Sequence, residues 1–134
     1  MEKLRHIAIA VPDLETAAKF YEETFGMERV RVSKVAIMLS DGVMSLAILH
    51  LPSNDNAPDE RGADFLGLHH IGFYAGDMDA TCSRVEENGG TFHGQIVNVG
   101  KGRDSERKYR DPNGVVVDIV NDDHVRDVWV IPVT

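Results

Sequence analysis

The sequence predicts an α+β protein built from two consecutive βαβββ modules. The first observation is an internal repeat, because residues 6–26 align without a gap on residues 70–90. The second is that an alternating segment is followed by one with helical spacing in each copy. The third is that three strand-like segments follow each helix. The aligned identities are His6 with His70, Ile7 with Ile71, Asp13 with Asp77, Glu22 with Glu86, Glu23 with Glu87, and Gly26 with Gly90.

Each copy opens with a strand, expected over residues 5–11 and 69–75. Successive strand residues point to opposite faces, so each strand has two different surfaces. One face is bulky and should pack on a helix: it carries Ile7, Ile9 and Val11 in the first copy and Ile71 and Phe73 in the second. The other face is mostly small and has a histidine at the same place in both copies: it carries His6, Ala8 and Ala10, matched by His70, Gly72 and Tyr74.

A helix follows each strand. Asp13 and Asp77 are the expected N-caps, because a short carboxylate accepts hydrogen bonds from the unpaired N–H groups of the first turn. Gly26 and Gly90 stand where each helix should end in left-handed backbone. The first helix has one apolar stripe at helical spacing, formed by Leu14, Ala17, Ala18, Tyr21 and Phe25.

Three strands should complete each copy, at about 28–33, 34–40 and 43–51 in the first and 91–98, 105–110 and 115–120 in the second. Asp41-Gly42 and the tetrapeptide at 111–114 (DPNG) are the expected turns before the last strands. The chain therefore divides into a first module (1–51), a polar linker (52–67), a second module (68–120) and a C-terminal tail (121–134). The tail is expected to end in a short strand-like stretch, Val128–Val133.

Composition limits the classes of partner. The formal net charge of −8, from 22 acidic and 14 basic residues, argues against a nucleic-acid surface, which needs a basic field. No apolar run approaches the roughly 20 residues that span a membrane, and the N-terminus shows no secretory signal. The single cysteine, Cys82, cannot form an internal disulfide, so a cytoplasmic location is expected. Cys82 itself should be a small core residue.

One carboxylate completes a candidate metal site. In the last strand of the second copy, Asp118 shares a face with two valines. Burying an unpaired carboxylate is costly, so Asp118 needs a cation, hydrogen bonds or water. His6 and His70 are equivalent in the repeat and should approach each other across a pseudo-twofold axis. Two histidines and one carboxylate with open coordination positions suit Fe(II), Mn(II) or a similar ion. The alternative is that the histidines are structural and bind no metal.

These segments resemble the vicinal-oxygen-chelate superfamily, which includes glyoxalases, bleomycin-resistance proteins and extradiol dioxygenases. The resemblance covers about residues 4–120 and is carried by residues 6–13 (HIAIAVPD), 69–73 (HHIGF) and 111–118 (DPNGVVVD). It implies a curved, mostly antiparallel sheet that forms a cup with helices outside. It also implies a divalent metal held by His6, His70 and Asp118, with Fe(II) or Mn(II) favoured and Zn(II) or Ni(II) as alternatives.

The first module lacks the ligand that the resemblance would place on its last strand. That position is Ala47, where glyoxalase I and methylmalonyl-CoA epimerase relatives commonly have Glu or Gln. Extradiol dioxygenases and fosfomycin-modifying thiol transferases bind the ion with three protein ligands, so the sequence favours these subfamilies. Asp118 also replaces the usual Glu, which shortens its reach by about 1.5 Å. Lys108 occupies the place of a tyrosine that extradiol enzymes usually carry.

The function implied is that of a divalent-metal-dependent enzyme whose small substrate chelates the ion through neighbouring oxygens. Dioxygenase, lyase, isomerase and thiol transferase chemistry all stay open. The alternative is a metal-free protein that sequesters a small ligand in the cup, as bleomycin-resistance relatives do. The resemblance also implies a homodimer, with the modules paired within one chain or swapped between two.

Further residues are expected around the cup. Lys108 and Tyr74 are candidate acid–base groups, with Tyr74 as part of the cup wall in the alternative reading. Ala8, Ala47 and Arg110 are candidate substrate contacts. The basic hairpin of Lys101, Arg103, Arg107, Lys108 and Arg110 predicts either a clamp for an anionic substrate or a solvated ribbon paired with Asp104 and Glu106.

The four remaining histidines receive separate predictions. His69 should face the helix side or the strand edge, so it is not expected to be a ligand. His50 is a less favoured substitute ligand near Ala47. His93 and His124 are expected to be exposed.

Overall fold

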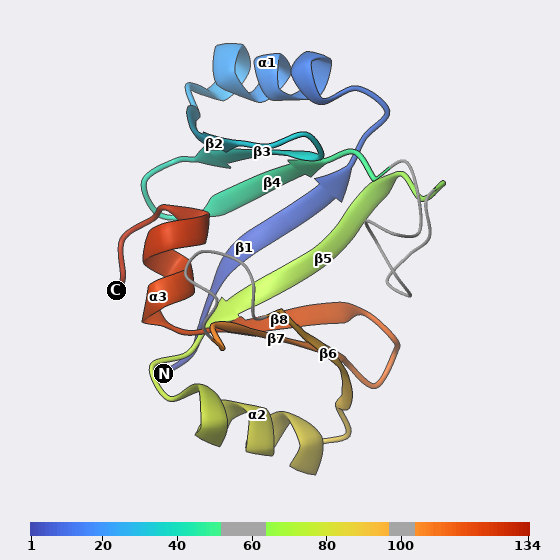
Figure 1. The fold of residues 1–134 in the computed structure, drawn as a ribbon, viewed down its shortest axis with the longest axis vertical. Helices are drawn as coiled ribbons and strands as arrows, with labels where there is room; N and C mark the ends of the chain where they lie inside the picture. Colours follow the sequence, from blue (N-terminus) through green and yellow to red (C-terminus); the bar gives the residue numbers. More distant parts are fainter. Residues whose placement is uncertain (52–63, 97–103) are drawn as a thin grey trace.

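Each copy of the repeat folds as a strand, a helix and three strands (Figure 1). The computed structural model describes residues 1–51, 64–96 and 104–134. The first module consists of β1 (Lys3–Ala10), α1 (Leu14–Phe25), β2 (Glu28–Val32), β3 (Ala36–Ser40) and β4 (Ser45–Leu49). The second consists of β5 (Gly67–Tyr74), α2 (Met78–Glu87), β6 (Thr91–Ile96), β7 (Glu106–Arg110) and β8 (Val116–Val120). The predicted α+β class is therefore confirmed.

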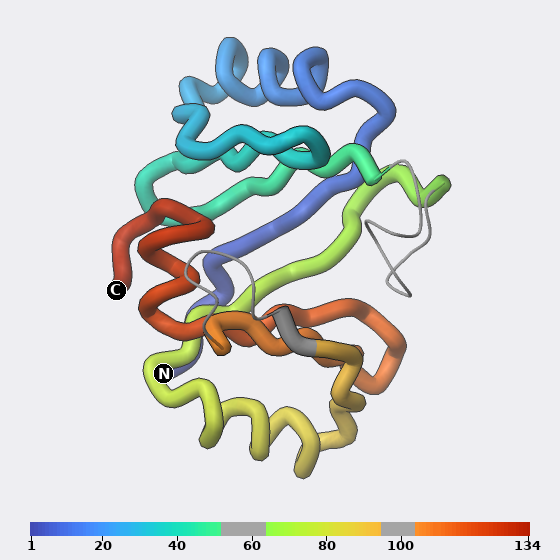
Figure 2. The backbone as a smooth tube through the Cα atoms, in the orientation of Figure 1, coloured from blue at the N-terminus to red at the C-terminus, as the bar shows by residue number. Residues whose placement is uncertain are grey.

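The strands of both modules form one sheet of eight strands in the order β2-β3-β4-β1-β5-β8-β7-β6. β1 is parallel to β4 and β5 is parallel to β8, whereas the other pairs are antiparallel. The modules meet within one chain, where β1 and β5 run side by side through the middle of the molecule (Figure 2). Ile7 pairs with Ile71, its equivalent in the repeat, so the pseudo-twofold axis passes between these residues.

Two β-bulges interrupt the pairing of β1 with β5. Ala8 pairs with His70 but Ile9 pairs with Leu68, so that His69 is the extra residue at this point of the ladder. At the other end, the register shifts between Leu4 and His6, so that Arg5 is the extra residue. Arg5 and His69 are equivalent in the repeat, and each directly precedes a candidate ligand. A bulge bends its strand and re-aims nearby side chains, so the duplicated bulges shape both halves of the site.

The helices begin as predicted. Asp13 accepts a hydrogen bond from the Thr16 backbone N–H at 2.9 Å, and Asp77 accepts one from Ala80 at 3.0 Å. Gly26 caps α1 in left-handed backbone with a φ of 70°. The prediction for Gly90 was wrong by one residue, because the left-handed glycine after α2 is Gly89, with a φ of 94°.

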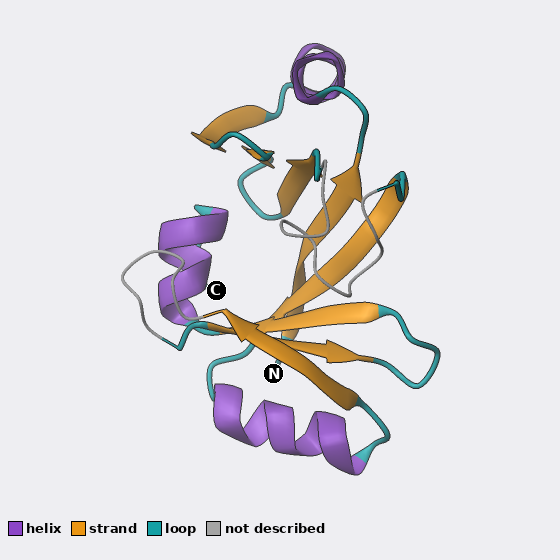
Figure 3. Cartoon of the chain, turned by 45° about the vertical axis from the view of Figure 1, so that its right-hand side comes forward, coloured by secondary structure: helices purple, strands orange, loops and turns teal. Residues whose placement is uncertain are grey.

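The bulky strand faces pack on the helices in part, since neither Ile7 nor Ile71 belongs to the clusters described under them. Ile9 and Val11 join the cluster under α1, while Phe73 joins the cluster under α2 that also contains buried Cys82. The predicted stripe of α1 is too wide at its end, because Phe25 is 65% exposed. Figure 3 shows α1 and α2 on one side of the curved sheet and the C-terminal helix on the other.

The C-terminal tail is helical from Asp122 to Trp129 and forms no strand after it, so the predicted strand-like stretch at its end was wrong. It forms a short helix, α3 (Asp122–His124), that continues directly into a π-helical turn, η1 (Val125–Trp129). Asn121 caps the start by accepting a hydrogen bond from His124 N–H. Val125, Val128 and Trp129 lie three and four residues apart, which places all three on one helical face, and all three are buried. His124, which was expected to be exposed, is only 2% exposed.

Some predictions fall on residues outside the described ranges. These are most of the proposed linker, together with Lys101 and Arg103 of the basic hairpin. Within the described ranges, none of the helices has the length and apolar character needed to cross a bilayer.

Candidate metal centre

The structure brings His6, His70 and Asp118 together on the inner face of the sheet. They come from β1, β5 and β8, and one potential ligand atom of each lies within 4.8 Å of the others. His70 Nε2 is 3.1 Å from Asp118 Oδ2, and the two imidazole centroids are 5.3 Å apart. All three residues are buried. The convergence arises because the β1–β5 pairing places the equivalent histidines on either side of the pseudo-twofold axis.

Both histidines are contacted at Nδ1 by a buried neighbour. His6 Nδ1 lies 2.9 Å from Ser45 Oγ, which comes from β4. His70 Nδ1 lies 2.7 Å from Nδ1 of His69. His69 was expected on the helix side or the strand edge and not among the ligands; it lies outside the metal-binding group, but the bulge at His69 breaks the alternation of the strand and lets its ring contact His70. The neighbours at Nδ1 leave Nε2 as the nitrogen available to an ion.

Asp118 is ionised despite its burial. Burial alone would raise the pKa of its carboxyl, but the neighbouring charges of His70 and Lys108 hold that pKa well below the usual range. Lys108 Nζ lies 3.0 Å from Oδ1. Oδ2 is buried and lies 3.1 Å from His70 Nε2. An ionised oxygen in that state is suited to a cation.

The donor set fits a divalent metal ion. Burial and the nearby charge of His70 lower the pKa of His6 well below its ordinary value, so the imidazole is neutral at neutral pH, as a ligand must be. Two imidazole nitrogens and a carboxylate oxygen are ligands that Fe(II), Mn(II), Zn(II) and Ni(II) accept. Together with the burial of the ionised Asp118, this chemistry makes the three residues a candidate metal centre.

Trp129 covers the site. Its indole stacks on the His6 ring, with centroids 4.6 Å apart and planes within 5°, and it is only 1% exposed. Gly72 permits this approach, because a Cβ there would lie 2.8 Å from the indole. The predicted substrate contacts Ala8 and Ala47 lie in the same hydrophobic cluster as Trp129 and are almost fully buried. In this conformation the tail, rather than an open cup, covers them.

The other predicted site residues lie around this centre with different partners. The Tyr74 hydroxyl donates to Asp122 Oδ1 at 2.7 Å, and that bond together with burial raises the pKa of Tyr74. Arg110 donates to the Gly114 carbonyl, in the turn between β7 and β8. His50 Nδ1 lies 3.1 Å from the Val11 carbonyl, and His50 is outside the metal-binding group.

A second buried polar group lies at the base of the tail. His124 Nδ1 is 3.3 Å from Ser105 Oγ, and its Nε2 is 3.6 Å from Glu106 Oε2. Burial lowers the pKa of His124 to about 4. Its ring also meets the Trp129 indole edge to face, with centroids 5.5 Å apart. Sequence reasoning missed this group, because His124 was expected to be exposed and Glu106 was considered only as a partner of the basic hairpin.

The described part of the basic hairpin is tied to acidic residues. Arg107 donates to Asp79 at 2.7 Å and to Asp104 at 2.8 Å. Lys108 is held by Asp118. The pairs of Arg107 favour the alternative in which the hairpin is a solvated ribbon. Of the basic hairpin residues that the structure describes, Lys108 is the one beside the candidate metal ligands.

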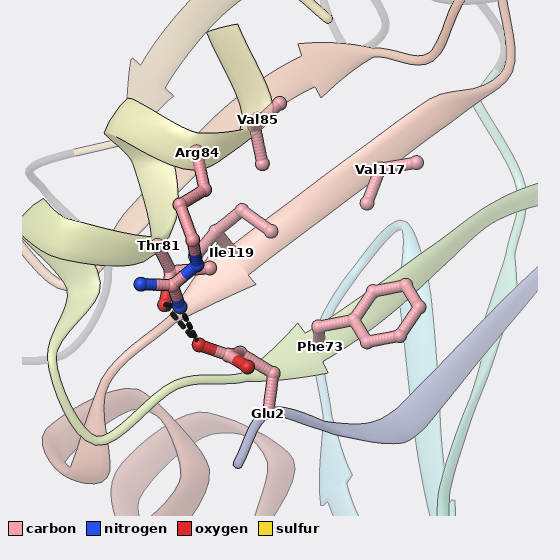
Figure 4. Close-up of a pocket in the computed structure, with 7 residues that line it drawn as sticks. All are labelled: Glu2, Phe73, Thr81, Arg84, Val85, Val117 and Ile119. Carbon is pink, nitrogen blue, oxygen red and sulfur yellow. Dashed lines mark hydrogen bonds and ion pairs between the residues drawn. The ribbon is translucent and has the colours of Figure 1, made fainter. Parts of the chain in front are cut away.

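A separate pocket lies between α2 and strands β5 and β8 (Figure 4). Its wall is mostly apolar, and Glu2, Thr81 and Arg84 interact at one side. Phe73 lines it and belongs to the cluster under α2, so the pocket is on the helix side of the sheet. It is therefore distinct from the candidate metal centre.

Comparison with known proteins identifies similar sequences and folds. The sequence profile of the Glyoxalase/Bleomycin resistance protein/Dioxygenase superfamily matches residues 3–119. The ethylmalonyl-CoA/methylmalonyl-CoA epimerase of Cereibacter sphaeroides is 35% identical over 101 residues, which cover 65% of this chain and 71% of that protein.

Solved structures of epimerases also superpose on this fold. A Streptomyces coelicolor methylmalonyl-CoA epimerase variant in complex with 2-nitronate-propionyl-CoA has a TM-score of 0.65 at 28% identity, covering 89% of this chain and 96% of that one. A methylmalonyl-CoA epimerase in complex with methylmalonyl-CoA and NH4+ has a TM-score of 0.67 at 27% identity, covering 90% and 94%.

Proposed function

Because this chain belongs to the Glyoxalase/Bleomycin resistance protein/Dioxygenase superfamily, we propose that it is a divalent-metal-dependent isomerase. Its substrate would be a small acyl compound that chelates the ion through neighbouring oxygens. The observation that carries the proposal is the convergence of His6, His70 and Asp118 on one point. The similarity to named epimerases favours isomerase chemistry over the dioxygenase and thiol transferase options left open by the sequence.

The proposed reaction is proton transfer at the carbon next to a carbonyl. A bound divalent ion would act as a Lewis acid and stabilise the negative charge that develops on the substrate oxygen. His6, His70 and Asp118 would hold that ion. Lys108 lies 3.0 Å from Asp118 and keeps its carboxylate ionised, so it is both a positioning group and the candidate acid–base group nearest the ion. Tyr74 is the second candidate.

A 2-alkylmalonyl thioester is the substrate class that we favour. The named relatives are epimerases of ethylmalonyl-CoA or methylmalonyl-CoA, and such a molecule offers a carboxylate and a thioester carbonyl on one carbon. Ala47 supplies no ligand where such relatives commonly have Glu or Gln, so the ion here would keep an additional open position. Fe(II) or Mn(II) stays our favoured ion, because the set contains a carboxylate and only two imidazoles.

The alternative function is metal-free binding of a small ligand. The observation that favours it is the apolar inner face, where Ala8, Ala47 and Met38 are buried against the tail. A ligand that replaced Trp129 would meet an apolar wall. Metal binding decides between the two functions, because a sequestering protein of this kind needs no ion.

The test combines metal content with proton exchange. Protein purified without chelator, or refilled with Fe(II), Mn(II), Zn(II) or Ni(II), should contain close to one ion per chain. His6→Ala, His70→Ala and Asp118→Ala should lose it, whereas His50→Ala should retain it. The loaded wild type should exchange the C-2 hydrogen of methylmalonyl-CoA with deuterium, measured by NMR. A wild type that binds no ion refutes the metal enzyme, and a loaded protein without exchange refutes the isomerase.

The homodimer stays a separate proposal, supported by the resemblance of the fold. The modules pair within one chain, so a dimer is not needed to bring the three ligands together. Light scattering on purified protein should give twice the chain mass of 14.8 kDa, and a mass equal to one chain would refute the dimer.

A further inference from the structure

The two candidate ligand histidines are oriented by different residues. We propose that Ser45 and His69 are positioning residues, which hold His6 and His70 so that both Nε2 atoms face the ion. The inference rests on the proposed metal site and names residues outside its ligand set. Ser45 is 1% exposed and His69 is 2% exposed, so each contact is made away from solvent.

The bulge in β5 is what makes the His69 contact possible. Neighbouring residues in a regular strand point to opposite faces, so His69 would otherwise face α2. The extra residue in the ladder breaks this alternation and brings the two Nδ1 atoms to 2.7 Å. The site therefore depends on a backbone irregularity placed directly before the ligand.

In the first module a different residue orients the ligand histidine. Its bulged residue is Arg5, whose guanidinium donates to the Leu4 carbonyl instead of orienting His6. Ser45 pairs with His6 in the register of β1 with β4, and its Oγ lies 2.9 Å from His6 Nδ1. The repeat therefore duplicates the ligand histidine and the bulge but not the group that orients the imidazole.

The chemistry explains why an ion needs these contacts. A neutral imidazole has one N–H donor and one acceptor nitrogen. If His6 donates from Nδ1 to Ser45 and His70 donates from Nδ1 to His69, both Nε2 lone pairs are free for metal. Ligand histidines commonly donate their other N–H in this way, and loss of the acceptor typically weakens metal binding about 10–100-fold.

The first experiment measures Co(II) affinity by chelator competition and the visible absorption of the bound ion. Ser45→Ala and His69→Leu should each weaken binding about 10–100-fold and change the spectrum. Ser45→Thr and His69→Gln keep an acceptor and should restore most of the affinity. His50→Gln, whose imidazole contacts the Val11 carbonyl, is the matched control and should bind as wild type does. Unchanged affinity and spectrum in Ser45→Ala and His69→Leu would overturn the inference while leaving the metal enzyme intact.

A second measurement needs no metal. In metal-free protein, imidazole ¹⁵N NMR should show a coupling between the Nδ1 atoms of His69 and His70, which requires a hydrogen bond between them. His69→Leu should shift the Nδ1 resonance of His70, and Ser45→Ala should shift that of His6. If the wild type takes up no Co(II), the proposed function fails, but the NMR result still decides the inference. If the coupling and the shifts are absent, Ser45 and His69 do not orient these two imidazole rings.

Discussion

Asp118 and Lys108 form an ion pair with little access to solvent, their side chains being 1% and 12% exposed. Removing one partner of a buried pair leaves an uncompensated charge, which typically costs about 3–5 kcal/mol. Lys108→Met should therefore lower the free energy of unfolding of metal-free protein by about that amount. A divalent ion bound to Asp118 would replace the missing charge, so Mn(II) should recover part of the loss. Urea denaturation with Mn(II) and with chelator measures both effects.

The exposed Lys34 provides a control for this variant. Lys34→Met should change stability little in either condition, because surface charges contribute little. An identical loss for Lys108→Met in Mn(II) and in chelator would contradict the placement of an ion beside Asp118.

His124 should make the protein sensitive to mild acid. Its pKa is about 4 in the folded state, because burial disfavours the charged ring, and about 6.5 when unfolded. Between these values the unfolded chain binds a proton that the folded chain does not, so stability falls as the pH is lowered from about 6.5 to about 4. At about 1.36 kcal/mol per pH unit, this gap corresponds to about 3 kcal/mol.

Denaturation at a series of pH values tests this sensitivity. His124→Gln should flatten the dependence between pH 6.5 and 4, although the lowered pKa of His6 leaves a residual slope of the same sign. The control variant His93→Gln, at a half-buried position in β6, should retain the full dependence. A wild-type stability that stays constant over this range would show that His124 is not held neutral by the fold.

Individual residues differ in how far the sequence predicted them. The repeat identified His6 and His70, and the charge within an apolar strand identified Asp118, because these signals depend only on spacing. The contact of His69 with His70 was not predicted, because a bulge leaves no mark in a pattern of period two. Ser45 was missed because its role depends on the register of β4 against β1, which spacing within a strand cannot supply.

At the scale of elements, the caps and the helix of each module were predictable because their signals are local. The tail was not, because its β-branched residues favour strands, namely Val125, Val128, Val130, Ile131 and Val133. The helical spacing of the buried residues acts through tertiary packing, since Val125, Val128 and Trp129 fill the inner face of the sheet. Packing overrode local propensity in this segment.

The tail helix ends at a strained residue. Val130 has a φ of 53° and is 39% exposed. Left-handed backbone costs a β-branched residue about 1–3 kcal/mol, whereas glycine adopts it without that cost but loses about 0.5–1 kcal/mol through its freer unfolded chain. Val130→Gly should therefore raise the free energy of unfolding by about 1 kcal/mol, measured by urea denaturation. Val32→Gly, at an exposed position in β2, should lower it, and a loss at both positions would contradict the strain at Val130.

At the scale of the molecule, the pairing of the two modules by β1 and β5 could not be chosen from the sequence, which allowed a swapped arrangement. The structure shows that one chain contains all three candidate ligands. It also shows that the tail lies on the inner face (Figure 3), where an open cup was expected. A substrate that reaches Ala8 and Ala47 must therefore displace Trp129.

Trp129 is the only tryptophan of the chain and reports on this displacement. Its indole is buried, so its fluorescence emission should shift to longer wavelength when methylmalonyl-CoA binds to the metal-loaded protein and moves the tail. Coenzyme A without the acyl group is the control ligand and should leave the emission closer to that of free protein. Catalytic proton exchange without any shift of the emission would show that substrate reaches the ion with the tail in place.

The register of the sheet relates Ala47 to Asp118 and to the position of the C-terminal tail. Ala47 pairs with Ala8 as Asp118 pairs with Gly72, so the two residues are counterparts in the duplicated halves. A Glu or Gln at position 47 would project into the space now occupied by Trp129 and its neighbours. We therefore expect the residue at position 47 and the path of the C-terminal tail to vary together among relatives. Relatives with a long polar residue at position 47 should end soon after the last strand or place their final residues elsewhere. Relatives with alanine there can have an indole over the first histidine.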